Sequence, residues 1–175
     1  MRSSRRRFRG AGRAPTGPLS AAYDRARGTA ATFPILIGAG AEIDARDPFG
    51  RNALFIGVEY GGVEAVKMLA EAGADTGRRP WGGRYEDLSP LLVAARLNLA
   101  DVIEVLAPAV RNVNAGDKRT RTALHEAVAA GSVEAAEALL TAGASPHRRD
   151  SKGFTPRDLA ARDGSPRMRL LLGVE

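Results

Sequence analysis

The sequence contains no cysteine, which excludes a disulfide framework and any metal site built from thiolates. Aromatic residues make up only 5% of its 175 residues. Because β-sandwiches and barrels draw on aromatic and β-branched side chains, this scarcity argues against both and favours small helices packed closely together. No apolar run reaches the roughly 18 residues that a membrane-spanning helix needs. The hydrophobic fraction of 44% is nevertheless large enough for a core.

Sequence signals of catalysis are equally scarce. The chain has two histidines, and it contains neither a His-x-x-x-His pair nor a Gly-x-Ser-x-Gly segment. Its glycine pairs at 61–62 and 82–83 lack the lysine of a phosphate-binding loop. Carboxylates recur instead as turn residues spread along the chain, where they accept hydrogen bonds from backbone N–H groups, at Asp44, Asp47, Asp75, Asp117 and Asp150. We therefore predict a protein that is not an enzyme and that uses no metal and no cofactor.

The formal net charge of +6 comes from one segment. Residues 1–18 contain six arginines and no acidic residue, which leaves 20 lysines and arginines against 20 aspartates and glutamates in the rest of the chain. The remainder is formally neutral. The basic character therefore belongs to a tail and not to a face of the fold.

A repeat of 33 residues runs through the sequence after this tail. Segments 47–79 and 117–149 share one order: an aspartate, a turn, a short apolar helix, a glycine, a second helix and a Gly-Ala pair. Ser89, Thr122 and Thr155 follow one another at intervals of 33 residues. No unit of this size can bury its apolar stripe alone, so we expect neighbouring units to stack into a solenoid.

The repeat resembles that of the ankyrin family. The Thr-Pro-Leu-His signature at the start of the first helix is matched most closely at 122–125 (TALH) and 155–156 (TP), and the glycine and Gly-Ala positions follow it. The resemblance covers residues 19–175. It implies an all-α ankyrin-repeat solenoid of stacked helix-turn-helix units with hairpin-like finger loops. It also implies a structural role for His125, because its family counterpart ties neighbouring turns together by hydrogen bonds.

We divide the chain into a disordered arginine-rich tail, residues 1–18, and a domain of five units at about 19–46, 47–79, 80–116, 117–149 and 150–175. The first and last units are atypical. In the third unit Asn98 replaces the glycine between the helices and Val110 replaces the glycine of Gly-Ala. Asparagine tolerates the left-handed conformation and valine does not, so we expect the corner at Val110 to be built differently. Pro108 should end the second helix of that unit early.

The ankyrin resemblance also implies a binding surface. In that family the finger tips and the exposed side of the first helices line a concave face that binds partners. The matching positions here are rich in aromatic and arginine side chains, the types that dominate binding hot spots. With the tryptophan of the inserted loop, the predicted partner-binding residues are Phe49, Arg51, Glu59, Tyr60, Trp81, Tyr85, Arg96, Lys118, Arg119, Arg121, Lys152 and Phe154.

Two interpretations of the single tryptophan remain open. Asn52 and Ser89 are 37 residues apart, so four residues are inserted between the second and third units, in the finger 77–87 that holds Trp81. Insertions in repeat proteins often lie on the binding face, which makes Trp81 and Tyr85 candidate anchors for a partner. Alternatively, Trp81 folds over the adjacent finger and covers the gap left at residues 108–110.

The basic residues along the finger edge also allow two interpretations. They indicate a partner with an acidic surface, or they form a solvated edge whose charge is balanced by nearby Asp117, Glu126 and Asp150. The residues concerned are Arg78, Arg79, Lys118, Arg119, Arg121, Arg148, Arg149 and Lys152.

The tail allows three interpretations. Its few apolar groups are typical of a disordered, solvated segment. Its cations could also bind the phosphates of nucleic acid or an anionic membrane surface, through Arg5, Arg6, Arg7 and Arg9. Thirdly, residues 4–8 (SRRRF) resemble the core of a bacterial twin-arginine export signal. The apolar segment that should follow is interrupted by Arg13, Pro15 and Pro18.

These observations predict a monomeric, cytoplasmic, non-catalytic module that binds another protein, as an adaptor, an inhibitor or an immunity-type binder. The alternative function is binding of nucleic acid or an anionic surface through the tail. The alternative location is the periplasm, if the tail acts as an export signal. The alanine- and arginine-rich composition is compatible with a bacterial source of high GC content.

Overall fold

The structure is a computed structural model that describes residue 38 and residues 40–174. Across these residues the chain forms pairs of helices and no β-strand, which confirms the predicted all-α class. The first helices of successive pairs are α3 (Ala53–Glu59), α5 (Pro90–Arg96), α7 (Ala123–Ala130) and α9 (Pro156–Asp163). The second helices are α4 (Val63–Glu71), α6 (Ala100–Leu106), α8 (Val133–Thr141) and α10 (Pro166–Leu171). Most of the predicted unit 19–46 lies outside the described residues.

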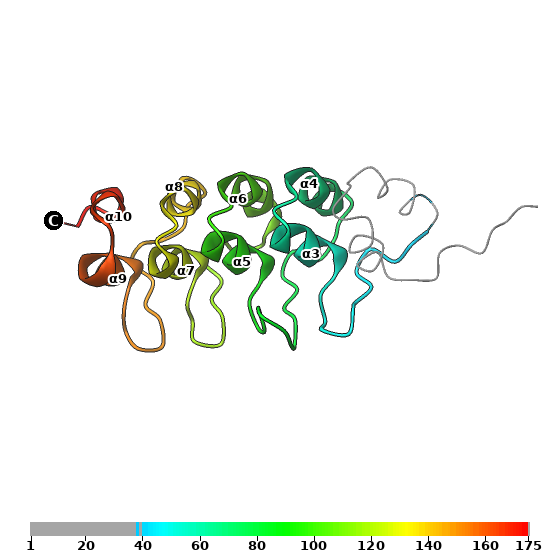
Figure 1. The fold of residues 1–175 in the computed structure, drawn as a ribbon, viewed down its shortest axis with the longest axis horizontal. Helices are drawn as coiled ribbons and strands as arrows, with labels where there is room; N and C mark the ends of the chain where they lie inside the picture. Colours follow the sequence, from blue (N-terminus) through cyan, green and yellow to red (C-terminus); the bar gives the residue numbers. More distant parts are fainter. Residues whose placement is uncertain (1–37, 39, 175) are drawn as a thin grey trace, which may run out of the picture.

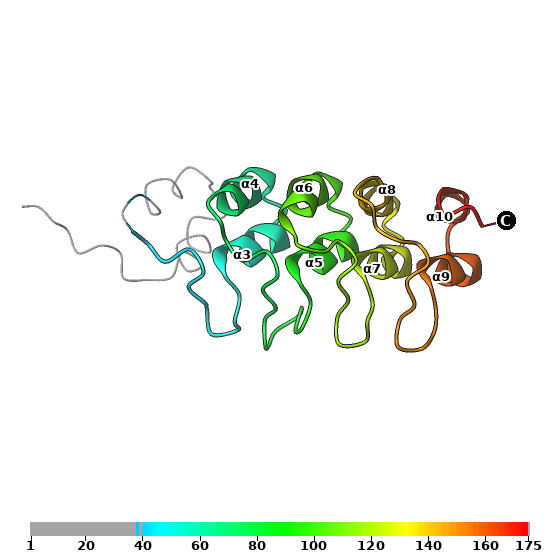
Figure 2. The ribbon, with the colours of Figure 1, turned by 180° about the vertical axis from the view of Figure 1, so that it is seen from behind.

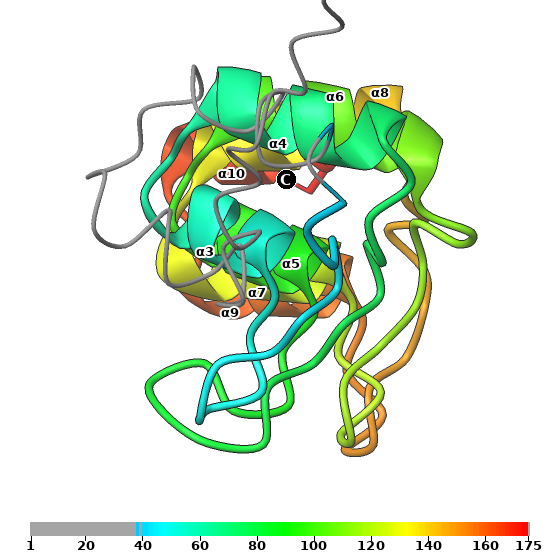
Figure 3. The same cartoon turned by 90° about the vertical axis from the view of Figure 1, so that its right-hand side faces the viewer.

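The helices form two layers, one of first helices and one of second helices (Figure 1). In the first layer α3 packs on α5, α5 on α7 and α7 on α9, and in the second layer α4, α6, α8 and α10 follow one another. The fingers project from the first layer on the side away from the second, and they all point the same way (Figures 1 and 2). In the end view the fingers extend well beyond both helix layers (Figure 3). The described chain is therefore a solenoid in which each unit packs on its neighbours.

The core runs continuously between the two layers. Equivalent leucines in four units lie in the second helix or, in the last unit, directly after it, and all four are buried: Leu69, Leu106, Leu139 and Leu172. On the first helix, Leu124 is also fully buried, and the equivalent residue 33 positions later is Arg157. Arg157 donates a hydrogen bond to the Gly173 carbonyl oxygen at 2.6 Å. A charged side chain at a core position fits the terminal unit of a solenoid, whose outer face is solvated.

The backbone conformation at each turn between helices follows from the type of residue at that turn. Gly131 and Asn98 both adopt the left-handed conformation, with φ of 72° and 58°, as predicted for the turn between first and second helices. At Val110 the chain is extended instead, with φ of −85°. A short 3₁₀ turn, η2 (Ala107–Ala109), carries Pro108 directly after α6 and brings the chain to this position. Both expectations for the third unit are therefore confirmed.

Candidate interaction surface

The fingers are shaped by a recurring aspartate. In the second unit the Asp47 carboxylate accepts hydrogen bonds from the N–H groups of Phe49 and Arg51, both at 2.9 Å. The same pair of bonds, to residues two and four positions later, recurs at Asp117 and Asp150. These carboxylates therefore act as turn residues, as the sequence predicted. The bonds also set the direction in which the side chains at the finger tips point.

Four aromatic side chains are exposed on the fingers and beside them. Tyr60, directly after α3, is 63% exposed, and Trp81 is 55% exposed. Phe49 and Phe154 are 50% and 38% exposed. All four belong to the predicted partner-binding set. Exposed apolar side chains mark interaction sites where they gather, so the side of the solenoid formed by the fingers and the adjoining ends of the first helices is the candidate interaction surface.

The ring of Trp81 lies against the finger of the preceding unit. Its indole N–H donates to the Pro48 carbonyl oxygen at 3.2 Å, and its backbone N–H donates to the Phe49 carbonyl oxygen at 3.0 Å. The guanidinium of Arg46 lies 5.2 Å from the ring centroid, a cation–π distance. These contacts fix one face of the ring and leave about half of the side chain exposed. The interpretation that Trp81 folds over the adjacent finger is therefore confirmed, but the ring packs on the second finger and does not cover the gap at 108–110.

A glycine makes this packing possible. Gly50 has φ of 85°, and a Cβ atom there would lie 2.4 Å from the Trp81 ring. We expect Gly50→Ala to push the ring into water, shift the single-tryptophan fluorescence to longer wavelength and cost about 2 kcal/mol of unfolding free energy. Gly153→Ala is the matched control, because Gly153 has φ of 84° and no atom within reach of a Cβ. Unchanged emission in Gly50→Ala would contradict the packing.

Tyr85 is the clearest correction to the predicted surface. Its side chain is only 4% exposed, and its ring centroid lies 6.4 Å from that of buried Phe55. The guanidinium of Arg84 covers the ring at 5.3 Å from its centroid. Tyr85 therefore belongs to the core under the inserted finger and cannot anchor a partner in this conformation. Its position within an insertion gave no sign of this, because the loop folds back towards α3.

Several predicted binding cations are engaged within the protein. Arg51 pairs with Asp47 at 2.7 Å and with Glu59 at 2.5 Å. Partial burial lowers the pKa of Arg51, but the hydrogen bonds and charges of these two carboxylates outweigh that effect and raise it overall. Lys118 lies 3.5 Å from an Asp87 carboxylate oxygen. The contact of Lys118 favours the interpretation of a charge-balanced finger edge at that residue, and Arg51 and Glu59 of the predicted partner-binding set are paired with each other.

Two more of the predicted binding cations form ion pairs with one buried glutamate. Glu126 is only 3% exposed, and its carboxylate accepts from Arg96 of the third unit at 2.8 Å. Arg121 approaches the other carboxylate oxygen at 3.3 Å. The sequence analysis missed the burial of Glu126, although a signal was present. The equivalent residues of the preceding units are Val93 and Ile56, both fully buried.

Two of the basic residues in the predicted partner-binding set remain available. Among the described residues, no acidic side chain forms an ion pair with Arg119 or Lys152, which lie in the fourth and fifth fingers. Both side chains are exposed. On the finger edge Arg148 and Arg149 are also exposed and form no ion pair in the part of the chain that the structure describes. The hypothesis of an acidic partner therefore depends on Arg119, Arg148, Arg149 and Lys152 and not on the whole finger edge.

His125 joins the fourth unit to the fifth. It is fully buried, its Nδ1 accepts from the Thr122 N–H at 3.1 Å, and its Nε2 lies 3.0 Å from the Phe154 carbonyl oxygen. These partners require a neutral ring that carries its proton on Nε2. Burial lowers the pKa of His125 below its ordinary value of 6.5, and the hydrogen bond to the Phe154 carbonyl offsets only part of this effect. The structural role implied by the family resemblance is confirmed.

This lowered pKa predicts a pH-dependent stability. The unfolded chain takes up a proton on His125 near pH 6.5, whereas the folded chain does so only at lower pH. The free energy of unfolding should therefore fall as the pH drops below 6.5, by at most about 1.4 kcal/mol per pH unit. Urea unfolding between pH 7.5 and 5.5, above the ordinary range of carboxylates, measures this slope. An equal slope in His125→Asn would contradict the assignment.

The described part of the chain holds no group of three histidine, aspartate or glutamate side chains that could bind a metal ion. No helix found there is long and apolar enough to cross a membrane. Arg5, Arg6, Arg7 and Arg9, the predicted polyanion-binding residues, lie outside the described residues.

The sequence matches a family model for ankyrin repeats in three overlapping copies, at residues 19–117, 73–150 and 91–175. It is 34% identical over 155 residues to neurogenic locus notch homolog protein 1 of Xenopus tropicalis, a match that covers 71% of this chain and 6% of that protein. Human neurogenic locus notch homolog protein 2 is 34% identical over 148 residues, which covers 67% of this chain and 6% of that protein. An ankyrin repeat protein of Acanthamoeba polyphaga mimivirus is 37% identical over 87 residues, covering 47% of this chain and 12% of that protein. These relatives are eukaryotic and viral, and the bacterial source stays a prediction.

Proposed function

Because the chain belongs to the ankyrin-repeat family, whose repeats are protein-interaction modules, we propose that its concave face holds a partner protein without chemical change. The observation that carries this proposal is the set of exposed aromatic rings on that face, at Phe49, Tyr60, Trp81 and Phe154. Such rings supply much of the binding free energy at protein interfaces. The module would act as an adaptor, a sequestering inhibitor or an immunity-type binder.

The arrangement of these rings supports a preformed surface. Trp81 is held by its hydrogen bonds to the second finger, and the finger itself is shaped by the Asp47 carboxylate. A ring that is already held in place loses little conformational entropy when a partner covers it, which strengthens binding. The chain spans only about 6% of the notch proteins that it matches, so the partners and activities of those proteins are not carried over.

We expect the triple variant Phe49→Ala/Tyr60→Ala/Trp81→Ala to lose its protein partner. Truncation of aromatic hot spots costs about 2 kcal/mol or more, so the affinity should fall at least about 30-fold. Affinity capture from the source organism's lysate, followed by titration of the retained protein, measures this change. Leu170→Ala is the control, because Leu170 is 81% exposed on α10, outside the concave face. Equal retention by the triple variant and the wild type would refute the proposal.

The alternative function rests on residues 1–18, with their six arginines and no acidic residue. It predicts that captured material is released by nuclease or by raised salt, because phosphate contacts weaken steeply with ionic strength. Deletion of residues 1–15 should then abolish binding, whereas the triple aromatic variant should keep it. The opposite pattern supports the concave face. Analytical ultracentrifugation of the same samples tests the proposed monomeric state.

A further inference from the structure

The grooves between successive fingers enlarge towards the C-terminal end of the solenoid. The groove between the second and third fingers has a volume of about 220 Å³, and the next groove has about 330 Å³. The groove between the fourth and fifth fingers reaches about 460 Å³. We call this last one the C-terminal groove. Its walls are the fingers 117–121 and 150–154, and the ends of α7 and α9 close its base.

The C-terminal groove carries a surplus of positive charge. Four cationic and two acidic side chains line it. Arg121 is paired with Glu126, and Arg162 is bonded to Asp163 at 2.7 Å. The Asp150 carboxylate already accepts two backbone hydrogen bonds from its own finger. Arg119 and Lys152 are thus the lining cations without an acidic partner among the described residues.

The groove between the third and fourth fingers has a smaller surplus of positive charge. Five cationic and four acidic side chains line the space between the third and fourth fingers. Lys118 lies against Asp87 there, and Arg96 and Arg121 share the buried Glu126. Arg84 and Arg119 have no acidic partner there among the described residues, but the lining has a surplus of only one positive charge, against two in the C-terminal groove. An external anion therefore gains more in the C-terminal groove.

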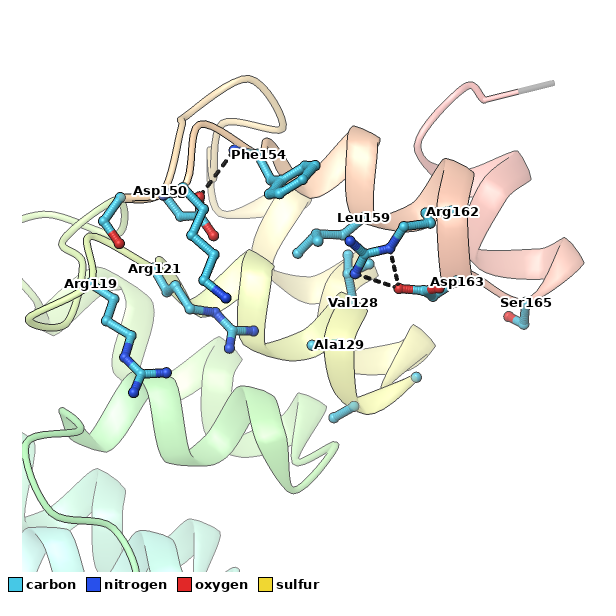
Figure 4. A pocket seen from close by; sticks show the side chains of 14 residues that line it. Arg119, Arg121, Val128, Ala129, Asp150, Phe154, Leu159, Arg162, Asp163 and Ser165 are labelled. Atoms are coloured by element: carbon cyan, nitrogen blue, oxygen red, sulfur yellow. Dashed lines mark hydrogen bonds and ion pairs between the residues drawn. The ribbon is translucent and has the colours of Figure 1, made fainter.

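The base of the C-terminal groove is apolar. Figure 4 shows Val128 and Ala129 between Arg119 and Arg121 on one side and Arg162 and Asp163 on the other. Leu159 and Phe154 continue this apolar surface. The Arg162 guanidinium lies over the Phe154 ring at 5.3 Å from its centroid, and the side chain is 38% exposed. The groove therefore offers an apolar contact directly beside two uncompensated cations.

We propose that the C-terminal groove binds an acidic peptide segment of the partner protein, with its carboxylates on Arg119 and Lys152 and an apolar side chain on Phe154. This inference rests on the proposed function and names the chemistry of the partner. The charge balance of the lining supports it, because an acidic segment supplies the charges that the groove lacks. The Phe154 ring adds contact area that a free anion would not use.

Nucleic acid fits the same groove less well. Proteins that bind nucleic acid non-specifically make about six to ten phosphate contacts, whereas the C-terminal groove offers two uncompensated cations. Its apolar base also offers no polar contact to a phosphate backbone. Nucleic acid binding is therefore an alternative outcome of the test.

The test is selection of a phage-displayed library of random 12-residue peptides on the full chain. Enriched peptides should contain aspartate or glutamate beside an apolar residue. The best peptide, synthesised with a fluorophore, should bind at least about tenfold more weakly to Arg119→Glu/Lys152→Glu and to Phe154→Ala. The charge-matched control is Lys67→Glu/Arg111→Glu, two exposed cations that do not line the C-terminal groove, and it should bind like the wild type.

Three results would overturn the inference. One is enrichment of peptides without acidic residues, or no enrichment at all. Another is equal loss of affinity in the two charge-reversed variants. The third is tighter binding of a fluorescent 20-nucleotide single-stranded DNA that depends on Arg119 and Lys152. Neutral or basic peptides that are lost in Phe49→Ala/Tyr60→Ala/Trp81→Ala would leave the proposed function standing, and only the acidic preference would fail.

Discussion

The double variant Arg96→Ala/Arg121→Ala is expected to lose about 3 kcal/mol of unfolding free energy, because it leaves the Glu126 carboxylate buried without a cation. Glu126 is 3% exposed and lies in α7, in the middle of the described stack. The two arginines approach it from the third and fourth units. Urea unfolding at neutral pH measures the loss. Mutation of ordinary surface arginines changes stability by about 0.5 kcal/mol or less.

A third substitution separates this explanation from a simple loss of side-chain packing. If the uncompensated charge causes the instability, Glu126→Met in the double-variant background should restore most of the lost free energy, because the site then resembles Val93 and Ile56 in the preceding units. A triple variant that stays as unstable as the double variant would show that the arginines stabilise the fold in another way. In that case Arg96 and Arg121 would again be candidate partner-binding residues.

Asn52→Ala should have a similarly large effect. Asn52 is fully buried, and its side-chain oxygen accepts from the Phe55 N–H at 2.9 Å, which caps α3. Its amide group donates to Asp44 at 2.9 Å and to the Asp75 carbonyl oxygen at 3.2 Å. The alanine removes the cap and leaves buried polar groups unpaired, so we expect a loss of about 3 kcal/mol.

Ser89→Ala is the internal control for Asn52→Ala. Ser89 occupies the same position before α5, but its side chain makes no capping hydrogen bond. Its substitution should cost less than about 1 kcal/mol. Hydrogen exchange should show faster opening of α3 and α4 in Asn52→Ala and little change at α7 to α10, since units of a solenoid depend mainly on their neighbours. Equal losses in the two variants would contradict the assigned role of Asn52.

The features that the sequence predicted correctly are those decided by short-range chemistry. The left-handed turn at Asn98 and the altered corner at Val110 follow from which backbone conformations these side chains tolerate. The stacking of units follows from a spacing that can be counted. The structural role of His125 was implied by the resemblance of a motif of four residues to the ankyrin family. None of these required knowledge of which side chains meet across the stack.

The candidate site was harder because its chemistry depends on contacts between units. Tyr85 looked like an exposed anchor, yet the inserted finger folds back and buries it beside Phe55. The pairing of Arg96 with Glu126 joins residues 30 positions apart in sequence. Comparison of equivalent positions could have revealed that pair, because a glutamate in a column of buried apolar residues requires a buried counter-charge. An inserted loop cannot be compared in this way, because the other units have no equivalent residues.

The inserted finger lengthens one loop without changing how the helices stack. The Asp87 N–H donates to the Pro80 carbonyl oxygen at 2.9 Å, so residues 81–86 form an excursion that is closed at its base. α3 still packs on α5, and α5 on α7, although four more residues lie between the first pair than between the second. A finger of this kind is a natural graft site. Segments of foreign sequence could be exchanged at residues 82–84, between Trp81 and the buried Tyr85, giving the scaffold new specificities while its helices keep their register.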